Sequence, residues 1–417
     1  MTFHASVILS VAKNLGLWLS FAPKLKMTQY PSFLSTRNSK LETRNCLMSD
    51  INDIGRIQSC IQNRLDLSAI GTKRLAAVIG DAPSRYSKSP ALWNAAFDAL
   101  KIDAVYLPLD VDDSRLAALL AAIEESDRWL GLNVTVPHKL AVMKHLDAID
   151  EKAARIGAVN TIVRTEDGRL VGANTDGEGF MQSLLTVQPG SAAPFLASLD
   201  GISVLILGAG GSARAVTFAL AERPERGRLY IANRTHESAV LLAGEIGKSY
   251  GNVAAIREEE APEYARKVDL IVNCTTKGQG GIRKNAAGAT VLEPYSALAP
   301  ADPTVVAKPA GGEPELYRGC LSASLPDIEA NNNASWNLAL SIPSGVGFYD
   351  LVYHPAETVF LRHGRVSGHR TLNGQGMIVA QAVEAFFNHV CRRVLEGAGL
   401  YTEKMRRRIL EVMTEAW

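Results

Sequence analysis

Several features that mark particular classes of protein are scarce in this sequence. It has five cysteines in 417 residues, without a Cys-x-x-Cys pair or a Cys/His ligand spacing. A small, odd number of scattered cysteines argues against a disulfide framework and a structural metal site, so we expect a reduced, cytoplasmic protein without a metal. The cysteines are Cys46, Cys60, Cys274, Cys320 and Cys391.

Charge of one sign and long apolar runs are also missing. The net charge is +1 and no long basic stripe is present, so nucleic acid is not an expected partner. The apolar run from Leu15 to Ala22 is far shorter than the roughly 20 residues that a membrane-spanning helix needs. We therefore expect no membrane partner.

Acidic residues are absent from the first 41 positions, although lysine and arginine occur there. Such a segment is typical of a signal or transit peptide, or of sequence upstream of a later start at Met27 or Met48. Both interpretations stay open. Residues 1–47 are predicted to be a leader or disordered extension outside the fold.

Removing residues 1–47 should leave a folded, active protein, because nothing in that segment matches the rest of the fold. Soluble expression and thermal unfolding of the truncated chain measure this. Loss of soluble expression on truncation would contradict the prediction.

The remainder has the composition of a large globular protein, with 47% apolar and 21% charged residues. A chain of this length is expected to form two domains. From Met48 onward, apolar runs of strand length alternate with segments of helical periodicity, which predicts a mostly parallel sheet. The expected helices are 51–67, 89–100 and 113–125, the expected strands are 75–79, 104–109 and 130–136, and a hairpin is expected from 159–164 and 169–174.

A strand, turn, helix and second strand can be read in order from Ser203 to Thr235. The apolar run 203–207 is broken by Gly208-Ala209-Gly210-Gly211, and small apolar residues then recur at helical spacing. Glycines at such a turn allow a tight bend and let a pyrophosphate approach the start of the helix. This stretch predicts a dinucleotide-binding βαβ unit.

The end of the second strand indicates which dinucleotide is bound. An acidic residue there would accept hydrogen bonds from the ribose of NAD, whereas Asn233-Arg234-Thr235 offers a guanidinium and a hydroxyl. These groups suit a 2′-phosphate, so NADP is the predicted cofactor.

Polar residues cluster where the predicted strands of the first domain end, which is where open α/β sheets bind ligands. In these motifs and those that follow, the chain resembles the shikimate dehydrogenase family from about Leu75 to Asn388, apart from one insertion. The motifs are Ser87-Lys-Ser89-Pro90, Asn133-Val-Thr135-Val-Pro-His-Lys139, Gly157-Ala-Val-Asn160-Thr161, Asn174-Thr-Asp176, Gly208-Ala-Gly-Gly211, Asn233-Arg-Thr235, Asn273-x-Thr275, Asp350-Leu-Val-Tyr353 and Asn373-Gly-x-Gly-Met.

The resemblance implies reversible NADPH-dependent reduction of 3-dehydroshikimate to shikimate, in the shikimate pathway of aromatic amino-acid biosynthesis. It implies Lys139 and Asp176 as the catalytic pair, without a metal. The implied substrate-binding residues are Ser87, Ser89, Thr135, Asn160, Asp176, Tyr353 and Gln381. The implied cofactor-binding residues are Gly208, Ala209, Gly210, Gly211, Ser212, Asn233, Arg234, Thr235, Asn273, Thr275 and Gly376.

The fold class expected from these observations is α/β, with an N-terminal α/β substrate domain and a Rossmann-like NADP-binding domain that carries an insertion. The substrate domain is expected to cover residues 48–176 and to be completed by 364–417. The NADP-binding domain is expected to cover 177–363, with the insertion at 279–345. We expect a monomer or a homodimer.

Two alternatives stay open. The enzyme could be a quinate/shikimate dehydrogenase that uses NAD, or the chain could be a non-catalytic module that senses the metabolite. Because a sensor has no need of a proton-transfer pair and this chain keeps both Lys139 and Asp176, the enzyme is favoured.

The expectations for the insertion and for the C-terminal region are structural. The insertion is interpreted as a partly helical flap beside the cofactor side of the cleft, in which Ser324 caps a helix that starts near Pro326. Helices are also expected from 356 to 363 and from 375 to 394, with Gln381 on the buried side of the second. The tail 402–417 is predicted to be a solvated helix.

Overall fold

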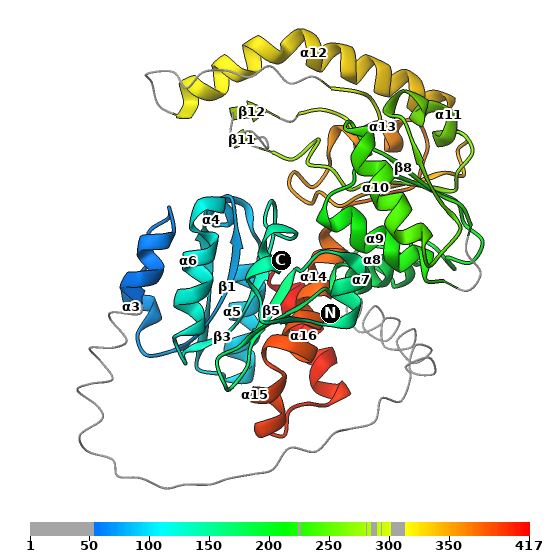
Figure 1. The fold of residues 1–417 in the computed structure, drawn as a ribbon. Helices are drawn as coiled ribbons and strands as arrows, with labels where there is room; N and C mark the ends of the chain where they lie inside the picture. Colours follow the sequence, from blue (N-terminus) through cyan, green and yellow to red (C-terminus); the bar gives the residue numbers. More distant parts are fainter. Residues whose placement is uncertain (1–53, 224–226, 281, 285–289, 293, 302–312) are drawn as a thin grey trace, which may run out of the picture.

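The computed structural model describes residues 54–223, 227–280, 282–284, 290–292, 294–301 and 313–417. Their two large sheets have six strands each, and the chain passes from the first sheet to the second and then returns (Figure 1). The predicted leader 1–47 and the start of the predicted helix 51–67 lie outside the described residues. Within them, no helix combines the length and the apolar composition needed to cross a bilayer.

The first sheet has the strand order β2-β1-β3-β5-β6-β4. β1 pairs in parallel with both β2 and β3, while β5 and β6 form the antiparallel hairpin expected from the sequence. The carboxyl ends of β1 and β3 therefore lie side by side, which gathers the polar motifs that follow them. The strands are β1 Arg74–Gly80, β2 Ala104–Asp110, β3 Trp129–Val134, β4 Ala148–Ile149, β5 Thr161–Arg164 and β6 Leu170–Ala173.

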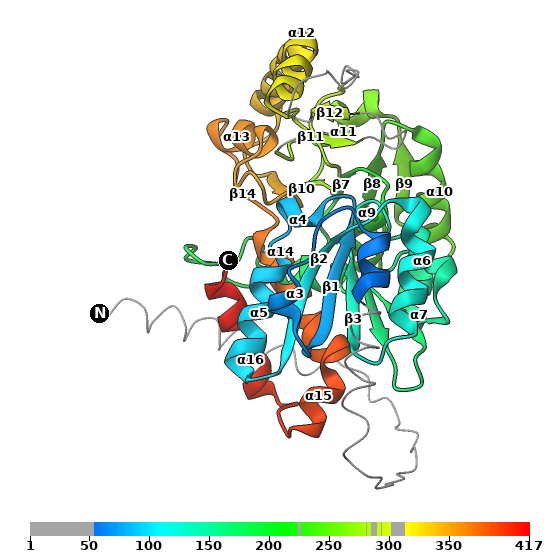
Figure 2. The same ribbon diagram turned by 90° about the vertical axis from the view of Figure 1, so that its left-hand side faces the viewer.

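Helices cover both faces of this sheet (Figure 2). Residues 54–60 are helical and end well before residue 67, so the predicted helix 51–67 is too long at its C-terminal end. The chain turns there and begins a new short helix, whose N-cap Asp66 accepts hydrogen bonds from the backbone of Ser68 and Ala69. The helices are α3 Leu67–Ile70, α4 Pro83–Tyr86, α5 Ser89–Leu100, α6 Asp113–Glu124, the 3₁₀ turn Ala141–His145 and α7 Glu151–Ile156.

The second sheet is wholly parallel, in the order β14-β13-β10-β7-β8-β9. Its central strand β7 is buried along its whole length, as its apolar run predicts, and ends at Gly208 with φ +113°. The strands are β7 Val204–Leu207, β8 Leu229–Ala232, β9 Val253–Ile256, β10 Leu270–Asn273, β13 Gly347–Asp350 and β14 Thr371–Leu372. The helices are α8 Asp176–Leu185, α9 Gly211–Ala221, α10 His236–Gly247, the 3₁₀ turn Glu258–Glu260, α11 Ala261–Ala265 and α13 Val359–Val366.

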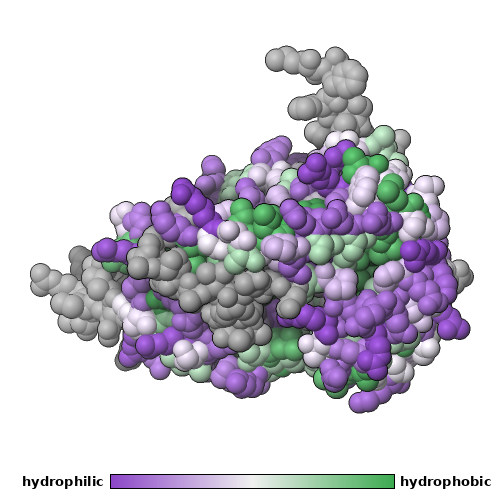
Figure 3. Space-filling view, turned by 90° about the horizontal axis from the view of Figure 1, so that it is seen from above, coloured by the Kyte–Doolittle hydropathy of each residue, from purple (hydrophilic) through white to green (hydrophobic). Residues whose placement is uncertain are grey.

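The insertion contributes a small hairpin of β11 Ile282–Lys284 and β12 Thr290–Leu292, and the long helix α12 Glu313–Ser341. The predicted helix start near Pro326 is wrong, because Pro326 lies inside α12 and Ser324 is buried within it. Burial of one face of α12, with Leu338 and Ala339 in the core of the second sheet, outweighs the roughly 3 kcal/mol that an interior proline costs. On the face of the molecule seen from above in Figure 3, hydrophobic residues are intermixed with hydrophilic ones.

The C-terminal helices return to the first sheet and pack against α5. They are α14 Gln375–Glu384, the π-helical turn Ala385–Val390, α15 Arg392–Gly397 and α16 Glu403–Glu415. The predicted helix 375–394 is thus interrupted at Cys391, and the helix predicted from 356 begins at Val359, capped by Thr358. The prediction of a solvated tail is also wrong, since Ile409, Val412 and Met413 of α16 are buried in the core.

Candidate active site

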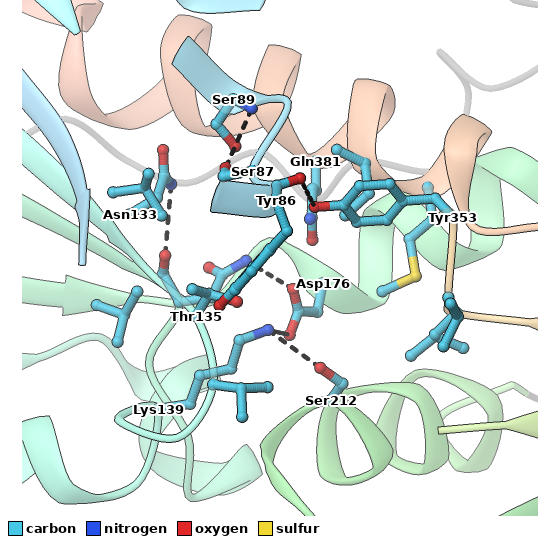
Figure 4. A pocket seen from close by; sticks show the side chains of 18 of the residues that line it. Tyr86, Ser87, Ser89, Asn133, Thr135, Lys139, Asp176, Ser212, Tyr353 and Gln381 are labelled. Carbon is cyan, nitrogen blue, oxygen red and sulfur yellow. Dashed lines mark hydrogen bonds and ion pairs between the residues drawn. The ribbon is translucent and has the colours of Figure 1, made fainter. Parts of the chain in front are cut away.

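A pocket opens between the two sheets, at the carboxyl ends of β1 and β3 (Figure 4). The structure brings all the sequence-predicted substrate and catalytic residues to this one pocket. They are Ser87, Ser89, Thr135, Lys139, Asn160, Asp176, Tyr353 and Gln381. Ser212 and Thr275, which were predicted to bind the cofactor, line it as well.

A buried ion pair lies at the floor of the pocket. The Lys139 Nζ atom donates to Asp176 Oδ2 at 2.6 Å and to Ser212 Oγ at 3.1 Å, and Asn160 Nδ2 donates to Asp176 Oδ1 at 2.8 Å. Asp176 is fully buried and Lys139 is 9% exposed. A buried charge pair is tolerated when its remaining hydrogen-bonding capacity is satisfied. The geometry therefore holds an ammonium at a fixed point facing the pocket.

Local backbone structure places Asp176. It is the first residue of α8, where a carboxylate is favoured by the helix dipole. Asn174 Oδ1 accepts from its backbone N–H at 3.0 Å, and Asn160 Oδ1 accepts from Thr175 N at 2.9 Å. The start of the helix is thereby attached to the first sheet. Asp176 consequently has a defined position relative to the end of β3.

Two glycines allow the close contacts that complete the floor. A Cβ atom on Gly211, at the start of α9, would lie 2.8 Å from Lys139 Cβ, so glycine at this position lets α9 approach the lysine. A Cβ atom on Gly179 of α8 would lie 2.8 Å from Gln381 Cβ on α14. Gly211, predicted to bind the cofactor, thus also has a packing role.

The opposite end of the pocket is lined by hydroxyl groups. Ser87 Oγ accepts from Ser89 N at 3.2 Å, and Tyr353 Oη donates to the Tyr86 carbonyl at 3.4 Å (Figure 4). The Gln381 Oε1 atom is buried and has no hydrogen-bond partner among the described residues. Because a buried polar atom needs a partner, this oxygen is suited to accept from a ligand hydroxyl.

A second pocket adjoins the first along the carboxyl edge of the parallel sheet. Five of the predicted cofactor-binding residues line it, namely Gly208, Asn233, Arg234, Thr235 and Thr275. A Cβ atom on Gly210 would meet nothing within 4 Å, so the turn after β7 keeps open space beside its backbone. The exposed Arg234 guanidinium and open backbone at a helix start fit a phosphorylated dinucleotide.

Five predicted cofactor-binding residues line neither pocket, namely Ala209, Gly210, Gly211, Asn273 and Gly376. Asn273 is fully buried, and its Oδ1 atom accepts from Thr275 N at 2.9 Å and Thr275 Oγ1 at 2.7 Å. It therefore shapes the loop that carries Thr275. Gly376 packs against the Gln188 side chain.

Sequence reasoning missed other residues that line the pockets. Tyr86, Asn133 and Met377 line the substrate pocket, and each is adjacent to, or within, a motif that had been recognised. Glu258 and Lys277 line the nucleotide pocket, together with residues 297–300 of the insertion. The sequence placed the insertion beside the cofactor side of the cleft, but no motif indicated which of its residues line this pocket.

Asp350, at the end of β13, gives a pH-dependent prediction. Its carboxylate is fully buried and accepts from Thr358 Oγ1 at 2.6 Å, and from Val352 N and Asn273 Nδ2 at 2.9 Å each. Burial raises the pKa of Asp350 to about 7, against the lowering effect of these donors. The pKa of Asp350 is higher in the folded than in the unfolded protein, so protonation of this side chain favours the folded state. Its contribution to the free energy of unfolding is complete below pH ~4 and is lost as the pH rises to about 7.

Between pH 4 and pH 7, the unfolding free energy of wild type should fall by up to about 4 kcal/mol relative to that of Asp350→Asn. The variant serves as the reference because asparagine does not titrate. Unfolding free energies of both proteins across this range measure the difference. A difference that stays constant with pH would contradict the prediction.

Comparison with known proteins assigns the family. The family model for the shikimate dehydrogenase substrate binding domain matches residues 78–162, and that for shikimate / quinate 5-dehydrogenase matches residues 191–295. The chain is 33% identical over 315 residues to a shikimate dehydrogenase (NADP(+)) of Lysinibacillus sphaericus, covering 75% of this chain and 91% of that protein. The chain belongs to the shikimate dehydrogenase family.

Other members agree with this assignment. The shikimate dehydrogenase (NADP(+)) of Moorella thermoacetica is 37% identical over 315 residues, which cover 75% of this chain and 86% of that protein. The crystal structure of the Thermus thermophilus enzyme with NADP(H) and shikimate covers 82% of this chain and 100% of its own, with 27% identity and a TM-score of 0.54. The resemblance and the α/β fold class predicted from the sequence are confirmed.

Proposed function

We propose that this member of the shikimate dehydrogenase family catalyses the reversible NADPH-dependent reduction of 3-dehydroshikimate to shikimate. This reaction is a step of the shikimate pathway of aromatic amino-acid biosynthesis. The observation that carries the proposal is the buried Lys139–Asp176 pair, at the floor of a hydroxyl-lined pocket that adjoins a nucleotide pocket. A reductase of a ring ketone needs a proton donor next to the site of hydride transfer.

The ion pair supplies the proton chemistry. NADPH, when bound, provides the hydride that reduces the carbonyl carbon of the substrate. The Lys139 ammonium gives a proton to the carbonyl oxygen, and in the reverse direction the neutral amine takes the hydroxyl proton. Asp176 stays a carboxylate and, with Ser212, holds Nζ in place through both steps.

The remaining pocket residues bind and orient the substrate. Ser87, Ser89 and Tyr353 are suited to the carboxylate, because hydroxyl groups donate to it at the end of the pocket away from the floor. Thr135, Asn160, Asp176 and Gln381 are placed to bind the ring hydroxyls. The unpartnered Gln381 oxygen supports this assignment.

The nucleotide pocket holds NADP. Arg234 and Thr235 offer donors to the 2′-phosphate, and the open space beside Gly210, in the turn after β7, leaves room for the pyrophosphate. Asn273 acts through Thr275, whose loop it holds. No residue in this assignment requires a metal.

An absorbance assay of the reduced cofactor, with purified protein, tests the proposal. Shikimate and quinate are each assayed against NADP and against NAD. The proposal expects the highest kcat/KM for shikimate with NADP. A preference for quinate or NAD would favour the alternative dehydrogenase, and binding of shikimate without turnover would favour a metabolite sensor.

The domain boundaries expected from the sequence are part of this proposal. Residues 48–176 and 364–417 would form the substrate domain, and 177–363 the NADP-binding domain. The chain returns to the first sheet, but β14 Thr371–Leu372 pairs with β13 in the second sheet, so the return begins after residue 372. The cytoplasmic location and the monomeric or homodimeric state remain predictions.

A further inference from the structure

Part of the insertion forms one side of the nucleotide pocket. Residues 296–300, which we term the wall loop, lie between the β11–β12 hairpin and α12 along the chain. Residues 297–300 line the same pocket as Asn233, Arg234 and Thr235. Ala297, Leu298 and Ala299 are also buried against the core of the second sheet, so the loop has a packed underside and a face on the pocket.

One side chain of α12 determines the shape of this loop. Asn331 is 3% exposed, and its Oδ1 atom accepts from Ser296 N at 2.8 Å. Its Nδ2 atom donates to the carbonyls of Ser296 at 3.1 Å, Ala299 at 3.0 Å and Pro300 at 2.9 Å. Both the N–H donors and the oxygen of this amide are thus bonded to the wall loop. One turn further along α12, Ser335 Oγ donates to Ser296 Oγ at 2.6 Å.

The loop is also attached from the pocket side. Lys277, two residues after Thr275, donates from Nζ to the Ala299 carbonyl at 3.0 Å and pairs with Glu258 at 2.9 Å. The Ala299 carbonyl therefore accepts both from the insertion helix and from the loop that carries a predicted cofactor-binding residue. This shared acceptor connects α12 to the nucleotide pocket.

We propose that the wall loop is a binding surface for the adenosine 2′-phosphate end of NADP and that Asn331 is the residue that positions it. The inference rests on the proposed use of NADP. A wall opposite Arg234 excludes water from the phosphate site, which strengthens a guanidinium–phosphate interaction by lowering the local dielectric constant. The wall loop then sets the affinity for the cofactor without lining the substrate pocket.

Two variants of the same helix test this inference. Asn331→Ala removes the hydrogen bonds to the loop, whereas Asn333→Ala makes the same chemical change at an exposed position of α12. Titration of NADPH fluorescence should give a Kd about tenfold or more higher for Asn331→Ala and unchanged for Asn333→Ala. The Kd for shikimate alone, from tryptophan fluorescence, should be the same in both. Equal NADPH affinities would overturn the proposal.

A second pair of variants leaves the residues of α12 unchanged. Pro300 is exposed and lines the nucleotide pocket, so its replacement does not disturb the core. Pro300→Asp places a carboxylate in the phosphate pocket, and Pro300→Asn is its uncharged match. The Asp variant should raise the Kd for NADPH about tenfold over the Asn variant and change the Kd for NADH little.

The outcomes separate this inference from the proposed function. Wild-type protein that binds NADPH, together with Asp and Asn variants of equal affinity, would refute the wall loop alone. Wild-type protein that does not bind NADPH would refute the proposed cofactor and, with it, this inference. Circular dichroism of each variant at the assay temperature confirms that the loss of binding is not a loss of fold.

Discussion

We expect Lys139→Ala to lower kcat by about 10²- to 10⁴-fold, which is the range for removing a positioned general acid or base. The ammonium is held at 2.6 Å from Asp176 and faces the substrate pocket, so its removal takes away the proton donor and leaves a buried carboxylate unpaired. Substrate binding should change much less, because the carboxylate end of the pocket is intact. Steady-state kinetics with shikimate and NADP measure both effects.

Lys144→Ala is the matched control for this prediction. Lys144 is an exposed lysine five residues further along, in the 3₁₀ turn that follows, and its replacement should retain full turnover. Thermal unfolding of the Lys139 variant separates a catalytic loss from a loss of stability. Wild-type turnover in a folded Lys139→Ala protein would remove the lysine from the reaction.

We expect Arg234→Ala to weaken NADP binding while leaving NAD binding almost unchanged. A guanidinium that forks onto the 2′-phosphate supplies one or two charge-assisted hydrogen bonds, each worth roughly 1.5 to 3 kcal/mol. The loss therefore corresponds to about a tenfold to 150-fold increase in Kd for each hydrogen bond. Values of kcat/KM for NADP and NAD, in wild type and variant, measure the discrimination.

Asn233→Asp should shift the cofactor preference from NADP towards NAD by more than Arg234→Ala does. A carboxylate at the end of β8 repels the phosphate and accepts from the ribose hydroxyls of NAD. Arg228→Ala is the control for Arg234, because Arg228 is exposed at the opposite, amino-terminal end of the same strand. If wild type prefers NAD, or if Arg234→Ala weakens both cofactors equally, Arg234 is a surface or packing residue.

Local sequence patterns were sufficient for most strands of the first sheet, for β7 and β8 of the second, and for the residues of the substrate pocket. The apolar runs at 75–79 and 204–207 became β1 and β7, and the polar motifs after the strands converge because parallel strands end at one edge. A motif predicts well where its residues act near the strand that carries them. Lys139 and Asp176 are of this kind, since Lys139 lies five residues after β3 and Asp176 lies three residues after β6, both strands of the first sheet.

Contacts between distant segments decided the rest. Pro326 lies in a helix that has one buried face and whose C-terminal end packs in the core of the second sheet, and Ile409 is buried because α16 meets α5. The sequence of α12 does not indicate the core that it contacts, and the sequence of α16 does not indicate its contact with α5. Burial on a distant surface outweighs the local preferences of proline, of a basic tail and of a capping serine, because packing gains exceed propensity differences.

The nucleotide pocket contains both kinds of residue, those recognisable from local sequence and those placed only by contacts between distant segments. Gly208 and Arg234 could be recognised from their places at the ends of successive strands, which local spacing alone determines. Asn331 and the wall loop could not, because the hydrogen bonds of Asn331 join residues more than 30 positions apart. The sequence by itself determined the fold class, the chemistry of the pocket and the family, whereas only the tertiary structure decided which residues of the insertion line the nucleotide pocket and that Asn331 is bonded to them.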